Sequence, residues 1–559
     1  MKIPFFKPVL VAGFTAILTG CGGSVPAIVS TPVENIDQMP LKITDLTEEQ
    51  LKTWSKADLA ADTIPGMSVK KAYEEVIPNR GGETVVVAVI DAGVDIEHED
   101  LDDVIWTNDD EIPGNGKDDD NNGYVDDIHG WNFLGDAVAM NLNYVRIYRD
   151  LKPKYDNIPT SSISAEDREE FELYKRAKAE YEKEYNEILG IKNQYEGIMQ
   201  QLKTAHEAVS AKLGKEDYTL AELDKMSVTS EEMQQYKSYL KQVMASIGTN
   251  VPDAMAQLQE ALDYYSGRLE THFNLNLNGR EIVGDDPDDL NDTDYGNNDV
   301  SGPDPKDHVK HGTHVAGIIA AERENNLGIK GIANNAEIMV LRAVPDGDEY
   351  DKDIARAIRY AVDNGATIIN TSFGKYFSSH PDWVFDAIEY AAENDVLIVN
   401  AAGNEGISLE QTMVYPNDQT VGSSTEIAEN FLTVGALDYR YGSNMVAGYS
   451  NYGITNVDIF APGSQIWSTT PNNGYEFLQG TSMAAPAVSG IAAVLRSYFP
   501  DLSAEQVKQI IMDSGLSTTA TVVLGGDPSN TQAFSQISTS GKMANLYNAF
   551  IMASKISKQ

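Results

Sequence analysis

The chain has 559 residues, with 85 acidic and 42 basic side chains and a formal net charge of −43. Such a surface repels nucleic-acid phosphates, so we expect no nucleic acid among its partners. The length allows one large domain with insertions or several smaller domains, and the hydrophobic fraction of 42% is ordinary for a soluble protein.

The first 20 residues have the features of a bacterial lipoprotein signal peptide. Lys2 and Lys7 accompany an apolar run at 8–19 that is too short to span a bilayer. The run ends in Leu-Thr-Gly before Cys21, the only cysteine, and this resembles the lipobox at which lipoproteins are cleaved and acylated. An ordinary signal peptide with an incidental cysteine is the alternative. We expect a lipid anchor at Cys21 that holds the protein in the bacterial cell envelope, outside the cytoplasm.

The segments after the signal peptide predict a linker and then an α/β domain. Residues 21–50 contain Pro, Ser and Thr without hydrophobic periodicity, which is typical of a linker. Residues 84–90 form a β-branched run, as expected of a parallel strand buried on both faces. Alternation of such runs with helix-like segments predicts a mostly parallel sheet, divided between 51–159 and 276–559. Further strands are expected at 338–341, 367–370, 396–399 and 431–434, and helices at 352–364 and 381–394.

Residues 160–275 differ in composition and predict an inserted α-helical module. They are rich in Glu, Lys, Gln, Tyr and Ala. Apolar side chains from Tyr174 to Leu202 recur every three or four positions, as on one face of a long amphipathic helix. Helix-start signals recur inside the segment, for example Thr219 with Glu222. We predict three or four helices whose tyrosine-rich face serves packing; a ligand-binding stripe is the alternative.

Three segments carry the residue types of nucleophilic catalysis. Asp91 ends the first buried strand, His311 precedes a run of small and apolar residues, and Ser482 stands at an expected helix start. Each signal alone is weak, since strands often end in Asp and His311 with His314 could form a metal pair. Together they supply a nucleophilic alcohol, a base to remove its proton and a carboxylate to orient that base.

These segments resemble the subtilisin-like serine peptidase family. The matching motifs are Asp91-Ala-Gly, His311-Gly-Thr-His-Val-Ala-Gly and Gly-Thr-Ser482-Met-Ala-Ala-Pro, in the order Asp, His, Ser that subtilisin has. The resemblance implies a three-layer subtilisin-like fold with Asp91, His311 and Ser482 as the catalytic triad and His314 as a structural residue. It implies a serine endopeptidase that hydrolyses protein or peptide substrates through an acyl-enzyme intermediate.

Further family-like segments imply where the substrate binds. By its motif position, Asn404 would donate a side-chain hydrogen bond to the oxyanion. An extended peptide would pair with the edge at 372–374. Small apolar walls favour an apolar P1 side chain, although Glu405 at the rim leaves Lys or Arg open. A Ser-Asn-Tyr-Gly segment at 450–453 would line the fold near this site. The expected substrate-binding residues are Ser372, Phe373, Gly374, Ala401, Ala402 and Gly403.

Two acidic stretches are typical of calcium loops. In the first, oxygen-bearing side chains stand at alternate positions around a glycine, although His129 replaces the final Glu of an EF-hand. The second, at 285–299, is denser but less regular. A solvated acidic loop is the alternative; because the family commonly carries structural calcium, we predict calcium as a cofactor. The expected ligands are Asp118, Asp120, Asn122, Tyr124 and Asp126.

Two other functions stay open at this point. One is a catalytically silent, calcium-dependent binding protein with the helical module as its working surface; the full triad and Asn404 argue against it. The other is an esterase or another acyl transferase on the same site. The oligomeric state is also open. Asp91 and His311 are 220 positions apart, against a few dozen in compact family members, so we expect a separable insertion whose removal preserves cleavage of small peptides.

Overall fold

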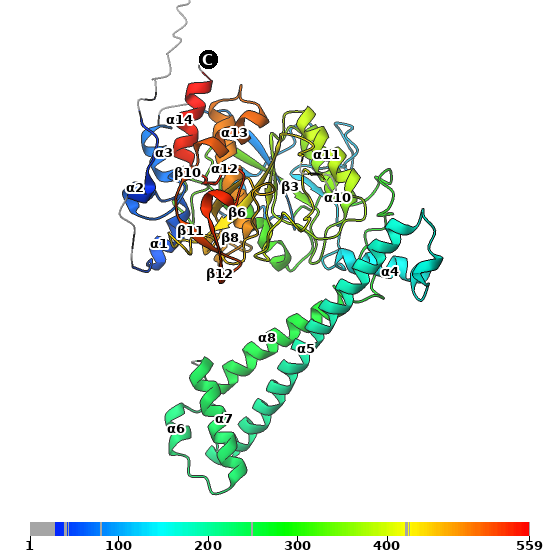
Figure 1. Ribbon diagram of the computed structural model, residues 1–559, viewed down its shortest axis with the longest axis vertical. Helices are drawn as coiled ribbons and strands as arrows, with labels where there is room; N and C mark the ends of the chain where they lie inside the picture. Colours follow the sequence, from blue (N-terminus) through cyan, green and yellow to red (C-terminus); the bar gives the residue numbers. More distant parts are fainter. Residues whose placement is uncertain are drawn as a thin grey trace, which may run out of the picture.

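The computed structural model describes residues 28, 30–38, 42, 44–78, 81–247, 250–419, 423 and 425–557. The predicted signal peptide at 1–20 and the predicted acylation site at Cys21 lie outside these residues. The described chain forms an α/β body from which a helical arm projects (Figure 1). None of the described helices is long and apolar enough to cross a membrane.

The body is built on a nine-stranded sheet with the order β10-β13-β7-β6-β5-β4-β1-β3-β2. Among the described strands of this sheet, the β10–β13 pair alone is antiparallel. The valine-rich β1 lies between β3 and β4, with Val87 opposite Ile338 and Ile368. The five predicted strands are therefore confirmed. The strand bounds are β1 Val85–Asp91, β2 Gly130–Asn132, β3 Ala336–Arg342, β4 Ile368–Thr371, β5 Leu397–Ala401, β6 Phe431–Leu437, β7 Ile459–Pro462, β10 Leu516–Ser517 and β13 Lys542–Met543.

Helices cover both faces of this sheet, which confirms the predicted three-layer α/β fold. Val87 and Val89 of β1 enter one core and Ala88 and Ile90 the other, because successive side chains of a strand point to opposite faces. The first face is covered by α9 and α12, with α13 and α14 against α12; the second is covered by α10 and α11. The bounds are α9 Lys310–Ala320, α10 Asp351–Asp363, α11 Pro381–Glu393, α12 Thr481–Tyr498, α13 Ala504–Ser514 and α14 Leu546–Ile556.

The segment that precedes β1 is part of the body. The buried Trp54 donates its indole N–H to the Ser464 carbonyl at 3.0 Å. Val33 exchanges two hydrogen bonds with the side chain of Asn548 in α14, at 2.8 and 3.0 Å. The predicted linker at 21–50 therefore does not describe residues 30–38, which are anchored by the buried Val33 and Ile36. The helices here are α1 Glu48–Thr53, α2 Leu59–Asp62 and α3 Val69–Glu75.

Two hairpins and six short 3₁₀ helices complete the body and its connections. The β8–β9 hairpin packs against α9, which carries His311. The bounds are β8 Ile466–Thr470, β9 Gly474–Leu478, β11 Thr521–Leu524, β12 Asp527–Ala533, and the 3₁₀ helices Ile36–Gln38, Trp54–Lys56, Asp102–Val104, Thr160–Ser162, Lys306–Val309 and Phe534–Gln536.

The helical arm consists of two long antiparallel helices with two shorter ones at the far end (Figure 1). These four helices fall within the predicted range 160–275, and α5, with 46 residues, is about 69 Å long. The tyrosine-rich face packs as predicted; Tyr195 stacks on Tyr265 with ring centroids 5.7 Å apart. At the base, α5 packs against α4, which precedes the predicted boundary. The bounds are α4 Asn143–Tyr155, α5 Arg168–Leu213, α6 Leu220–Lys225, α7 Glu231–Ile247 and α8 Val251–Glu270.

Candidate active site

Asp91 and His311 meet at the C-terminal edge of the sheet. Asp91 ends β1, and His311 is the second residue of α9. The helix approaches the strand closely because residue 312 is glycine: a Cβ at Gly312 would lie 2.2 Å from the Gly93 carbonyl oxygen. His311 Nδ1 lies 2.8 and 2.9 Å from the two carboxylate oxygens of Asp91. Asp91 therefore orients the imidazole ring.

The Asp91 carboxylate also controls the protonation of His311. Burial favours the neutral imidazole, but the attraction of Asp91 and its hydrogen bond outweigh burial, so the pKa of His311 is raised. The Asp91 side chain is 2% exposed, whereas that of His311 is 40% exposed. With Nδ1 facing the carboxylate, Nε2 is the ring nitrogen that can accept a proton from a nucleophile.

His314 has the structural role that the family resemblance implied. It is fully buried, and its Nε2 lies 3.0 Å from the Ile466 carbonyl oxygen and 3.2 Å from that of Glu476. Burial lowers the pKa of His314 to about 3, so the ring is neutral and Nε2–H is the donor in these bonds. It therefore ties α9 to the β8–β9 hairpin.

Ser482 lies at the start of α12, against the predicted substrate-binding edge. Its hydroxyl donates to the Ser372 carbonyl at 3.0 Å, and the Ser372 hydroxyl donates to the Ser482 carbonyl at 2.9 Å. A hydrogen bond between a nucleophilic hydroxyl and its base often forms only when substrate is present. As the second residue of a helix, Ser482 also has a backbone N–H without an intrahelical partner.

Asn404 is oriented to act as a hydrogen-bond donor beside Ser482. Its amide oxygen accepts from the backbone N–H of Thr481 at 2.8 Å and from the Thr481 hydroxyl at 3.1 Å. With the oxygen occupied in this way, Nδ2 is the end of the amide that can serve an oxyanion, together with the Ser482 N–H. Sequence reasoning missed the role of Thr481, although its position next to Ser482 was a signal.

The turn that carries Asn404 is held by the buried Asn451. Asn451 Nδ2 donates to the Ala402 carbonyl at 3.0 Å, and its Oδ1 accepts from the Glu405 N–H at 3.2 Å. Gly403 has φ = +100°, and a Cβ there would lie 2.4 Å from Asn451 Nδ2, so a side chain cannot be accommodated. Asn451 belongs to the Ser-Asn-Tyr-Gly segment, whose function the sequence alone did not reveal.

The predicted substrate-binding segments extend from two neighbouring strands. Residues 372–374 continue β4, and 401–403 end β5 and continue beyond it. Ala401 and Ala402 line a small cavity together with Val414. Val414 Cγ1 would lie 3.1 Å from a Cβ at Gly374, so the valine narrows the space beside that edge. Nothing in the sequence pattern had indicated Val414.

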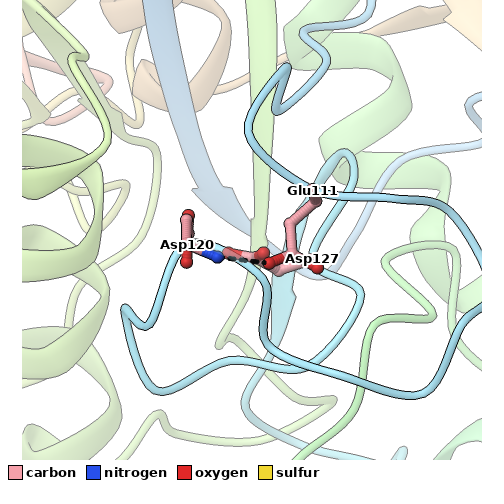
Figure 2. Close-up of side chains that lie close together, drawn as sticks. All are labelled: Glu111, Asp120 and Asp127. Carbon is pink, nitrogen blue, oxygen red and sulfur yellow. Dashed lines mark hydrogen bonds between the residues drawn. The ribbon is translucent and has the colours of Figure 1, made fainter.

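A group of carboxylates gathers in the acidic loops after β1. Glu111, Asp120 and Asp127 each offer an oxygen within 4.8 Å of the others (Figure 2). Glu111 is 6% exposed, and its Oε2 has no hydrogen-bond partner among the residues that the structure describes. Burial raises the pKa of the fully buried Asp127 carboxyl. These oxygen donors fit a hard cation such as calcium.

Only Asp120 among the five predicted calcium ligands belongs to that group. The carboxylates of Asp118 and Asp126 accept hydrogen bonds from backbone N–H groups of the loop, which folds back on itself. Asn122 donates its amide to Asp120 at 3.0 Å, and the Tyr124 ring is buried in the core. Asp127 directly follows the predicted loop, whereas Glu111, nine positions before Asp120, carried no recognisable signal.

The second acidic stretch, at 285–299, is engaged differently. Asp285 is paired with Arg280 and with Lys352, at 2.6 Å in both cases, and all three side chains are buried. Its charge is therefore compensated by cationic side chains. Within the described ranges, Glu111, Asp120 and Asp127 form the one group of three or more His, Cys, Asp or Glu residues close enough to share a metal ion.

Known serine proteases are similar in sequence to this chain. The model of the subtilase family (peptidase S8) matches residues 82–535. A thermophilic serine proteinase from Bacillus sp. (strain AK1) is 42% identical over 222 residues, which cover 40% of this chain and 48% of the relative. Subtilisin BL from Lederbergia lenta is 34% identical over 233 residues, covering 41% and 79%. A solved structure of a protease from Pseudoalteromonas arctica PAMC 21717 is 28% identical, with a TM-score of 0.35. The match covers 44% of this chain and 70% of the chain of that protease.

The family match is much longer than the pairwise ones. The chain spans about half the length of the thermophilic serine proteinase that it matches. The family model, in contrast, extends over all three triad segments and over most of the body. The chain therefore belongs to the subtilase family.

Proposed function

We propose that the protein is a serine endopeptidase that hydrolyses peptide bonds through an acyl-enzyme intermediate. The observation that carries the proposal is the Asp91–His311 pair, at 2.8 Å, on the same sheet edge as Ser482 and Asn404. His311 Nε2 takes the proton of the Ser482 hydroxyl as it attacks the substrate carbonyl carbon. Asp91 stabilises the imidazolium that forms, and His311 then returns the proton to the leaving amine.

The oxyanion formed by this attack would be stabilised by two donors, the Asn404 Nδ2–H and the Ser482 backbone N–H. Thr481 fixes the amide of Asn404 before the substrate arrives, so little reorganisation is needed when the charge develops. A water molecule then hydrolyses the acyl-enzyme, with His311 again acting as the base.

We expect substrates with a medium-sized apolar P1 side chain. Val414 lines the same small cavity as Ala401 and Ala402 and lies close to Gly374, which leaves less room for a large P1 side chain. The alternative, a basic P1 residue paired with Glu405, is less favoured because Glu405 Oε2 already accepts three hydrogen bonds. These come from the Tyr376 hydroxyl, from Asn451 Nδ2 at 3.0 Å and from the Asn404 N–H at 2.9 Å.

Replacing the nucleophile tests the endopeptidase proposal. Ser482→Ala should lower the turnover of internally quenched peptides by about 10⁶-fold, the loss known for the triad serine of subtilisin. It should also abolish labelling by a fluorophosphonate probe. A mutant that still reacts with the probe would assign the nucleophile elsewhere. A wild-type protein that hydrolyses esters but not peptides would favour the esterase alternative.

We also propose that Cys21 carries the lipid anchor that holds the enzyme in the cell envelope. The motif before Cys21 supports this, and several acyl chains give stable anchoring where a single chain does not. Cys21→Ser should move the protein from the detergent phase to the aqueous phase in a phase-partitioning assay. Persistent detergent partitioning of the variant would contradict the proposal.

Calcium bound by Glu111, Asp120 and Asp127 is the proposed cofactor. Glu111 Oε1 accepts from the backbone N–H groups of Asp119 and Asp120, whereas the buried Oε2 has no hydrogen-bond partner among the described residues, which supports an ion at that oxygen. Such a divalent ion would offset most of the negative charge of the three carboxylates and hold the two ends of the loop together. Its role would be structural, since none of these residues belongs to the triad.

A further inference from the structure

Tyr376 and Phe377 link the substrate-binding edge to the helical arm. They follow residues 372–374 after a single intervening residue. Phe377 is 7% exposed and packs into an aromatic cluster between α4 and α5, which we call the arm base. The Tyr144 ring lies 5.6 Å from the Phe377 ring, and the Arg176 guanidinium lies 5.1 Å from its centroid. The cluster comprises Ile147, Tyr148 and Tyr155 of α4 and Phe171, Tyr174 and Ala177 of α5.

Tyr376 carries this contact onward to the turn that holds Asn404. Its ring packs against both the arm base and the main core of the body. Its hydroxyl donates to Glu405 Oε2, and burial raises the pKa of Tyr376, which keeps the hydroxyl protonated. The same Glu405 oxygen accepts from the Asn404 backbone N–H at 2.9 Å and from Asn451 Nδ2 at 3.0 Å. Two consecutive side chains therefore connect the arm base with Glu405, at the rim of the expected pocket for the P1 side chain, which we call the S1 pocket.

The other side of this segment is fixed to α10. Lys375 is buried, pairs with Asp351 at 2.8 Å and donates to the Glu349 carbonyl at 2.8 Å. Arg146 of α4 donates to the same Glu349 carbonyl at 2.9 Å. The Ser379 N–H donates to Asp351 at 2.9 Å. Residues 375–379 are thus held between the start of α10 and the arm base.

We propose that the arm base is part of the substrate-binding apparatus, and that Phe377 and Tyr376 are positioning residues for Glu405 and the S1 entrance. This inference rests on the proposed endopeptidase function. It does not extend to the far part of the arm, whose helices form a separate core around Leu202, Leu223 and Leu240. The proposal differs from the expectation that all of 160–275 can be removed without loss of peptide cleavage, because Phe171 and Tyr174 lie in the same cluster as Phe377.

The test measures the cleavage of a series of chromogenic peptides that differ only at P1. It compares two variants that each lose an aromatic ring, Phe377→Ala and Tyr195→Ala. Phe377→Ala should lower kcat/KM by about 10-fold, mainly through KM, because small displacements of a binding wall have large kinetic effects. It should also change the ratio of kcat/KM between peptides with an apolar P1 residue and peptides with lysine at P1. Phe377→Leu should restore most of the lost kcat/KM and most of the wild-type ratio. The control is Tyr195→Ala, which removes a stacked ring far along the arm and should leave both quantities within about 2-fold.

A second variant keeps the test valid if Phe377→Ala does not fold. Tyr376→Phe removes only the hydroxyl that contacts Glu405 and should shift the same P1 ratio toward lysine, since the Glu405 carboxylate is then less occupied. Folded variants with the wild-type P1 ratio would overturn the inference, even if their melting temperatures fall. Failure of the wild-type protein to cleave any peptide would instead overturn the endopeptidase function, so the two failures are distinguishable.

Discussion

The catalytic edge of the sheet and the helical arm hold their side chains in place in different ways. At the edge, β1 is buried on both faces, and Asp91, Asn451 and Thr481 each make hydrogen bonds that fix a neighbour. The long α5 buries only a minority of its residues and divides them among the arm base, a small cluster around Ile188 and Phe273, and a separate distal core. Several buried contacts therefore fix the positions of the side chains at the sheet edge. We expect the arm to affect these side chains only through the part of it that packs against the body.

The largest expected effect comes from breaking the edge at Asp91. Asp91→Asn should lower kcat by about 10⁴-fold, the loss known for this substitution in a serine peptidase triad. In the wild type, the pKa of His311 is raised by Asp91, so activity should fall as the pH drops through that pKa and the base becomes protonated. Without the carboxylate charge, burial lowers the pKa of His311, and the acid limb of the pH–rate profile should move to lower pH.

A neighbouring carboxylate provides the control for that pH profile. Asp95 is buried and paired with Lys306 at 3.0 Å, and it does not contact His311. Asp95→Asn should therefore leave the acid limb where it is in the wild type. Two results would contradict the conclusion that Asp91 raises the pKa of His311. One is an acid limb that does not move in Asp91→Asn, and the other is an acid limb that moves equally in both variants.

A smaller effect is expected from removing calcium from the loop beside the edge. An ion that binds only the native protein stabilises it by about 2.7 kcal/mol when present at 100 times its Kd. Excess chelator should therefore lower the melting temperature by a few degrees, measured by calorimetry or intrinsic fluorescence. Glu111→Gln should abolish this sensitivity, because it removes a ligand charge. Glu324→Gln, at an exposed acidic residue outside the loop, should retain it; equal chelator sensitivity of both variants would refute the site.

The smallest effect is expected from shortening the arm beyond its base. A short Gly/Ser turn in place of residues 198–262 would remove α6, α7 and the distal core but keep Tyr195 opposite Tyr265. Because the described residues of that core belong to the arm alone, kcat/KM for small peptides should stay within about 2-fold of the wild type. Loss of peptide cleavage in a variant that keeps its melting temperature would show that the whole arm, and not only its base, supports the cleft.

The sequence by itself determined the elements whose signals are local. The β-branched runs predicted five strands, and the period of three to four residues predicted the arm helices, because burial imposes these patterns on neighbouring positions. The capping box of Thr219 with Glu222 marked the start of α6, as the structure has it. The triad residues were recognisable because each lies inside a short family motif.

Only the tertiary structure decided which residues from distant segments touch. Glu111 joins Asp120 through the folding of a loop, and Thr481 orients Asn404 from another element. Phe377 enters the arm base although it lies between β4 and α11, far in the sequence from α4 and α5. Local patterns record whether a side chain is buried but not its partner, since the partner is chosen by the packing of elements far apart in the chain. For that reason the sequence alone predicted the triad of Asp91, His311 and Ser482, whereas the contacts between the arm base and Glu405 required the fold.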